Sequence, residues 1–148
     1  MPPFRFRLQT LERLREAARD ACREQLADAL RVDDLLRTQE EQLQGNLKLA
    51  RDLQVMRAGR VDVDRLLEAQ RYEAAVTIEV RHIADQRARV AEELERRRQA
   101  LVEADREVKV LEKLKAARRA EYDRAAQRAD VKLLDEAAGR VRATEVDV

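Results

Sequence analysis

Apolar residues recur at alternating steps of three and four along two long stretches of the chain. This spacing lays one apolar stripe along a helix and is typical of a coiled-coil seam. The first helix begins somewhere between Phe4 and Leu11, and ten of its fourteen seam positions are apolar. The predicted seam comprises Leu8, Leu11, Arg15, Ala18, Cys22, Gln25, Ala29, Val32, Leu36, Gln39, Leu43, Asn46, Ala50 and Leu53.

The second stretch carries a longer seam with the same spacing. Its steps of three and four run over about eight heptads, which predicts a left-handed supercoil. No Pro or Gly lies between Gly59 and Gly139, so a helix of roughly 75 residues and about 110 Å can form. The predicted seam comprises Leu66, Ala69, Glu73, Val76, Val80, Ile83, Arg87, Val90, Leu94, Arg97, Leu101, Ala104, Val108, Leu111, Lys115, Arg118, Tyr122 and Ala125.

A short link around Gly59 separates the two helices. Gly59 is a candidate helix C-terminator, with Arg57 in the last turn. Asp62 or Asp64 is a candidate N-cap for the helix that follows. A link this short makes two long helices antiparallel neighbours.

The two helices are unequal in length. A turn centred near Gly59 places Arg5 opposite Lys113, so the chain beyond about Lys115 has no partner from the first helix. We therefore expect one all-α domain over residues 1–148, a long antiparallel two-helix coiled-coil hairpin with an overhanging C-terminal helix. Its expected parts are a first helix at about 5–57, a turn at about 58–63, a second helix at about 64–138 and a frayed tail at 139–148.

The composition agrees with long helices. Charged residues make up 41% of the chain and aromatic residues 3%, which matches coiled-coil usage. Cys22 is the single cysteine and cannot form an internal disulfide, so nothing indicates an oxidising compartment. The N-terminus lacks the apolar core of a secretory signal, and no apolar run approaches the roughly 20 residues that span a bilayer. We expect a cytoplasmic protein, with peripheral association to a membrane complex left open.

Catalytic and metal-binding motifs are missing from the sequence. His82 is the single histidine, and we interpret it as a helix-surface residue because no second ligand lies at suitable spacing. Cys22 falls on the first seam, where a small buried hydrophobe is the simplest role. The carboxylates alternate with Arg and Lys at helical spacing, and no phosphate-binding loop or nucleophile motif is present. We expect neither enzyme activity nor a cofactor.

The charge is unevenly distributed along the hairpin. Residues 1–23 and 106–128, which the hairpin brings together, carry a net charge of +7, whereas residues 31–84 carry −1. This asymmetry suits an acidic partner at the open end, although a plain solvated surface explains it equally well. Acids are too interspersed for a typical nucleic-acid interface. Near the turn, Tyr72 beside Val76 is either a core residue or an exposed anchor for a partner.

Two segments resemble the flagellar export protein family FliJ. The opening FRFRLQTLERLRE resembles its N-terminal signature, an aromatic and basic start that leads into a Leu-spaced helix. The stretch from Val108 to Ala138 resembles its C-terminal signature, although the part between Tyr122 and Asp130 is unusually rich in alanine. The matching residues are Leu111, Glu112, Lys113, Leu114, Tyr122, Asp135 and Glu136.

The resemblance implies a soluble, non-enzymatic component of the flagellar type III export apparatus, with a role in motility and chemotaxis. Family members form an antiparallel coiled coil similar to the stalk of rotary ATPases. The resemblance further implies three partners: the hexameric export ATPase, whose pore receives the paired helix ends, the membrane export gate and the export chaperones. Such a protein would associate peripherally with the inner face of the cell membrane.

We assign candidate binding residues on this basis. For the ATPase they are Arg5, Arg7, Leu111, Leu114, Tyr122 and Asp135, and for the export gate they are Tyr72 and Val76. Independently of any family, a lone helix beyond Lys115 is marginal in water without a partner, which also points to a binding site there. Two alternatives stay open: the analogous stalk of a virulence secretion system, and a basic coiled-coil nucleic-acid-binding protein.

Overall fold

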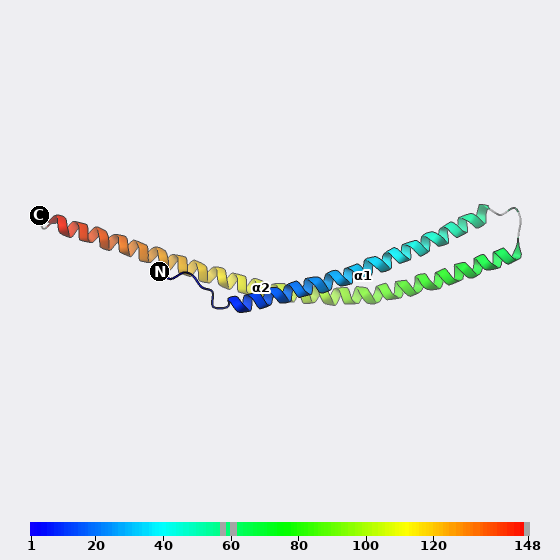
Figure 1. Cartoon of the computed structure of the whole chain (residues 1–148), viewed down its shortest axis with the longest axis horizontal. Coiled ribbons are helices and arrows are strands. Elements are labelled where there is room, and N and C mark those ends of the chain that lie inside the picture. Colours follow the sequence, from blue (N-terminus) through cyan, green and yellow to red (C-terminus); the bar gives the residue numbers. More distant parts are fainter. Residues whose placement is uncertain (57–58, 60–61, 147–148) are drawn as a thin grey trace. The chain divides into compact units, whose positions relative to one another are not determined.

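The computed structural model describes residues 1–56, 59 and 62–146. The described chain forms two helices, α1 (Gln9–Met56) and α2 (Val63–Val146), and contains no strand (Figure 1). Residues 1–19 and 103–148 form one compact unit, the end unit, and residues 20–102 form another, the turn unit. In each unit a stretch of α1 packs against a stretch of α2, which confirms the all-α helical hairpin.

In the turn unit, cross-helix ion pairs establish the direction of the two helices. Asp33 on α1 pairs with Arg87 on α2, and Arg51 pairs with Glu73. A residue later on α1 therefore pairs with a residue earlier on α2, which means that the two helices are antiparallel.

Asp62 is the N-cap of α2. The backbone N–H of Asp64 donates to Asp62 Oδ1 at 3.1 Å, and the N–H of Leu66 donates to the carbonyl of Asp62 at 3.0 Å. The first bond satisfies a donor that a helix start leaves without a partner, and the second is the first backbone hydrogen bond of the helix. The expected cap by Gly59 and Arg57 depends on residues 57, 58, 60 and 61, which lie outside the described part of the chain.

The predicted seam of α2 is confirmed from Ala69 to Lys115. Every seam position in this range is buried or half-buried, and Val108 is completely buried. Outside this range Leu66 and Arg118 are exposed, whereas Tyr122 and Ala125 are half-buried. The seam residues with the least exposure are Val76, Ile83, Leu94, Ala104, Val108 and Leu111.

The predicted seam of α1 is wrong at every second position in the turn unit. Ala29, Leu36 and Leu43 face inward as expected, but Gln25, Val32, Gln39 and Asn46 are exposed. The residue that follows each of these lies inward instead: Leu26, Asp33, Glu40 and Leu47. Arg87, which occupies the opposite seam, favours this shift because it pairs with both Asp33 and Glu40.

In the end unit the first turns of α1 are also rotated from the prediction. Leu8, Leu11, Arg15 and Ala18 are exposed, whereas Glu12 is buried. The Glu12 carboxylate lies 3.1 Å from Lys115 Nζ, so pairing with the opposite seam explains why an acid lies inward here.

The first helix begins at Gln9 and not near residue 5. Residues 2–8, which we call the strap, precede it and run beside α2 (Figure 1). Arg5 consequently lies in the strap, and Glu12, not Arg5, is level with Lys115, after which the partner of α2 is the strap and no longer a helix. The predicted pairing of Arg5 with Lys113 is therefore wrong, because an extended chain rises about 3.3 Å per residue against 1.5 Å in a helix.

The tail expected at 139–148 is helical through Val146, and residues 147 and 148 lie outside the described chain. The Thr144 hydroxyl donates to the carbonyl oxygens of Arg140 and Val141, which ties this last part to the helix. All side chains from residue 130 to residue 146 are exposed. No helix in the described ranges is apolar over a length that could cross a membrane.

Candidate functional site

The strap meets α2 in a cluster of aromatic and basic side chains. Phe4 and Tyr122 lie with ring centroids 5.6 Å apart and planes tilted by 56°. The Arg119 guanidinium carbon lies 5.3 Å from the Phe4 centroid and 5.8 Å from the Tyr122 centroid, within cation–π range. Lys115 Nζ lies 6.0 Å from the centroid of the buried Phe6. We call these five residues the strap cluster.

Two polar contacts support the strap cluster. The Tyr122 hydroxyl donates a hydrogen bond to the carbonyl oxygen of Pro2. Lys115 also pairs with Glu12, whose side chain is only 11% exposed. One Glu12 oxygen, Oε2, is buried without a hydrogen-bond partner. Within the described structure, the ion pair with Lys115 offsets the cost of removing this carboxylate from water.

Basic residues outnumber acids around the strap cluster. Some are neutralised: Arg118 pairs with Glu121 and Arg119 with Asp123, each at 3.2 Å. Within the described segments 5–13 and 113–128, six exposed basic residues form no ion pair. They are Arg5, Arg7, Arg13, Lys113, Arg124 and Arg128. This surplus gives the surface a positive potential that attracts acidic groups.

Beyond the strap cluster, α2 continues as an overhang, residues 123–146, past the strap (Figure 1). Val131, Leu134 and Val141 are 56%, 69% and 57% exposed, and with Ala138 they follow the spacing of a seam. Leu133 beside them is 64% exposed. From residue 130 to residue 146 the overhang is therefore an amphipathic helix whose apolar side chains are all exposed in the described part of the chain.

The expected ATPase-binding residues are only partly brought together. Leu111 is buried in the α2 seam, and Leu114 and Tyr122 are half-buried. Arg5 and Arg7 are exposed on the strap, close in sequence to Phe4 and Phe6 of the cluster. Asp135 stands apart on the overhang, thirteen residues or about 20 Å of helix beyond Tyr122.

The expected gate-binding residues differ from each other in exposure. Tyr72 is 44% exposed, so the interpretation of Tyr72 as a core residue is wrong. Val76 is 5% exposed and belongs to the seam of the turn unit. Of the two, only Tyr72 offers surface to a partner without separation of the helices.

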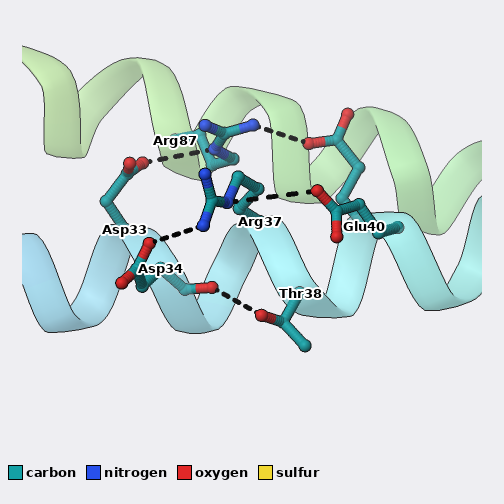
Figure 2. Close-up of polar contacts among 7 residues, drawn as sticks. Asp33, Asp34, Arg37, Thr38, Glu40 and Arg87 are labelled. Atoms are coloured by element: carbon teal, nitrogen blue, oxygen red, sulfur yellow. Dashed lines mark hydrogen bonds and ion pairs between the residues drawn. The ribbon is translucent and has the colours of Figure 1, made fainter.

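A charged cluster interrupts the seam of the turn unit. Arg87 on α2 reaches across to α1, where Nε lies 3.2 Å from Asp33 and Nη1 lies 3.0 Å from Glu40 (Figure 2). These hydrogen bonds raise the pKa of the Arg87 guanidinium above its ordinary value. A charged group held in a seam favours one register of the two helices over its neighbours, because any slip separates the charges.

Metal binding finds no support in the described residues, since no group of three or more potential ligands is found among them. His82 is exposed on α2, in agreement with its interpretation as a surface residue. Cys22 is half-buried on α1 and is a free thiol.

Sequence reasoning missed several residues of the strap cluster. Phe4 and Phe6 alternate with Arg5 and Arg7, and this period of two was the available signal for an extended segment. Arg119 carried no such signal, because many Arg residues occupy similar helical positions.

The comparisons with known proteins place the chain in a family. The family model described as flagellar FliJ protein matches residues 4–145. No curated protein and no solved structure is significantly similar to the chain. The matched range begins at Phe4 of the strap and ends near the end of the overhang. The chain therefore belongs to the flagellar FliJ protein family, whose members are components of flagellar protein export.

Proposed function

We propose that the protein is a non-enzymatic stalk of the flagellar type III export apparatus. In this role it binds the hexameric export ATPase and couples it to the membrane export gate and to substrate chaperones. It acts in the cytoplasm, in peripheral association with the inner face of the cell membrane, and supports motility. Family membership supports the place in export, and the overhang of α2 supports a binding role.

The overhang is the observation that carries this proposal. A lone helix of this length is marginal in water, and most helical stability in proteins comes from packing of an apolar face. Val131, Leu134 and Val141 present such a face and are more than half exposed. Binding to a partner would bury these side chains and stabilise the helix at the same time.

We assign the ATPase contact to the strap cluster and the overhang together. Tyr122, Arg5, Arg7 and Asp135 offer exposed or half-exposed groups for direct contact. Leu111 and Leu114 lie between the helices or at their edge, and they act mainly by holding the strap end of the hairpin together.

We assign the gate contact to Tyr72, with Val76 as its support. Tyr72 precedes Val76 by one helical turn, so packing at Val76 determines the position of the exposed ring. An aromatic residue with an exposed face is a common anchor in protein interfaces.

A truncation tests the assignment to the overhang. A variant that ends at Arg124 keeps Tyr122 and the strap contacts with Lys115, Arg119 and Tyr122. We expect it to stay helical and to lose binding to the export ATPase, measured by co-elution and by stimulation of ATP hydrolysis. Binding that survives this truncation would show that the overhang is not the contact.

A point variant with a matched control refines the test. Leu134→Asp puts a charge on the apolar face of the overhang, whereas Ala143→Asp puts the same charge on the polar side. We expect Leu134→Asp to weaken binding at least 10-fold, about 1.4 kcal/mol. Equal effects of the two variants would contradict a contact through the apolar face.

The unpaired cations near the strap provide a reason to test one alternative, binding to nucleic acid. Six exposed basic residues could contact phosphates, although acids such as Glu121 and Asp123 lie among them. A salt-dependent mobility shift with duplex DNA at physiological ionic strength would support this alternative. The absence of a mobility shift would exclude nucleic-acid binding.

A further inference from the structure

The strap has the features of a bound peptide. It comes before the first residue of α1, and its side chains alternate, with Phe4 and Phe6 against α2 while Arg5 and Arg7 are exposed. This alternation is that of an extended chain, in which successive side chains point to opposite sides. The strap therefore presents one aromatic face to α2 and one basic face to solvent.

The surface of α2 under the strap is formed by Lys115, Arg119 and Tyr122. Residues at this spacing share one face of a helix. Each of them touches a different part of the strap: Lys115 faces the Phe6 ring, Arg119 faces the Phe4 ring, and Tyr122 contacts the Phe4 ring and the carbonyl of Pro2. The helix thus recognises two aromatic rings two residues apart and one backbone carbonyl.

Except at the Pro2 carbonyl, which accepts the hydrogen bond from Tyr122, the strap contacts α2 through its side chains. Among the described residues, the backbone hydrogen bonds of this region stay within residues 6–12, as in the bond from Gln9 N to the Phe6 carbonyl. Ordering an extended segment costs conformational entropy at each residue. Contacts of this kind make the strap replaceable by a segment of the same chemistry.

We propose that this face of α2 is a binding site for an extended segment with aromatic residues at positions i and i+2. In the free protein the chain's own Phe4 and Phe6 occupy the site. A partner segment of this kind must displace the strap, and displacement also frees Arg5 and Arg7 to move. The view that such a partner belongs to the export ATPase rests on the proposed function, whereas the site itself does not.

Fluorine NMR can test the site directly, because the chain has only two tyrosines, Tyr72 and Tyr122. The full-length double variant Phe4→Ala/Phe6→Ala, labelled with 3-fluorotyrosine, keeps the strap backbone but lacks both rings. A synthetic peptide of residues 1–9 is then added. We expect a saturable shift of the Tyr122 signal toward its wild-type position, with the Tyr72 signal unchanged as an internal reference.

Two controls define the specificity of the site. A peptide with alanine in place of both phenylalanines should cause no shift. The wild-type protein should bind the intact peptide several-fold more weakly than the double variant, because a short tether keeps its own strap at an effective concentration in the mM range. The variant Tyr72→Phe assigns the two signals.

The result that overturns the proposal is a Tyr122 signal that stays unmoved by peptide up to about 1 mM, the affinity limit of a very weak ligand. A shift that the alanine peptide reproduces also overturns it. Phe6 is buried, so its replacement removes a core side chain. The single variant Phe4→Ala, which keeps Phe6, is therefore titrated with the same peptide, and circular dichroism checks that both variants are folded. The experiment needs no ATPase. A failure of this site can therefore be distinguished from a failure of the protein to bind the export ATPase.

Discussion

The ion pair between Glu12 and Lys115 should stabilise the end unit more than a shorter ion pair on its surface. The Glu12 side chain is 11% exposed and the Lys115 side chain 40% exposed, at a distance of 3.1 Å. Arg15 and Glu107 lie closer, at 2.8 Å, but are 44% and 49% exposed. Solvent screens the second pair more strongly, so burial and not distance should decide the coupling.

Two double-mutant cycles measure this difference. We expect a coupling free energy of about 1.5–2 kcal/mol for Glu12 with Lys115, between the values for exposed and fully buried pairs. For Arg15 with Glu107 we expect about 0.2–1 kcal/mol. Replacement of Lys115 by methionine alone should be the most damaging single change, because it leaves the Glu12 carboxylate buried without a cation.

The assay is chemical denaturation followed by circular dichroism, with the alanine and methionine variants of each pair. Added salt to 1 M shortens the screening length to about 3 Å and should remove the coupling of the exposed pair first. For a chain of this length, the buried coupling corresponds to roughly 3–8 °C in Tm. Equal coupling energies in the two cycles, or equal sensitivity to salt, would refute the argument from burial.

Three further changes test other parts of the hairpin. Gly45→Ala should stabilise the protein by about 1 kcal/mol in thermal denaturation, because Gly45 lies within α1 and, apart from its chain neighbours and the local helix backbone, no atom lies within 4 Å of an added Cβ; a lower Tm would contradict this. Arg87→Gln should lower Tm, because it leaves the Asp33 and Glu40 carboxylates without their shared cation; Arg89→Gln, at an exposed position, should leave Tm unchanged. Hydrogen bonds from Arg96 and Arg97 lower the pKa of Glu93 from its ordinary value of 4.5, so its contribution is present above that pH and lost as the pH falls through the lowered pKa. Glu93→Gln should therefore reduce stability at pH 7 but not at pH 2–3, and a difference that persists in acid would contradict this origin.

The period of the apolar positions was sufficient to predict the hairpin and most of the α2 seam. Between Ala69 and Lys115 most seam positions are apolar, and the charged ones bond to α1. These are Glu73, Arg87, Arg97 and Lys115. The sequence offered two candidates for the N-cap of α2, Asp62 and Asp64, and the structure shows that Asp62 is the N-cap. The overhang was also predictable, because its existence follows from unequal helix lengths.

The α1 seam was not predictable in the same way. Where the prediction failed, the expected positions and the positions that follow them both mix apolar and polar residues, so the apolar spacing does not select one rotation of the helix. Arg87 on the opposite helix favours the rotation that brings Asp33 and Glu40 inward. A pattern within one helix cannot contain this information, because the deciding charge lies about fifty residues away in sequence.

The sequence by itself therefore determined the number of helices, their antiparallel direction and the part of α2 without a helical partner. Family resemblance added Arg5, Arg7 and Tyr122 as candidates. Only the tertiary structure decided that the first residues form a strap and that Phe4, Arg119 and Tyr122 meet. The physical reason is that helical periodicity is a local property of the chain. The position of an extended segment depends instead on contacts with side chains more than a hundred residues away in sequence.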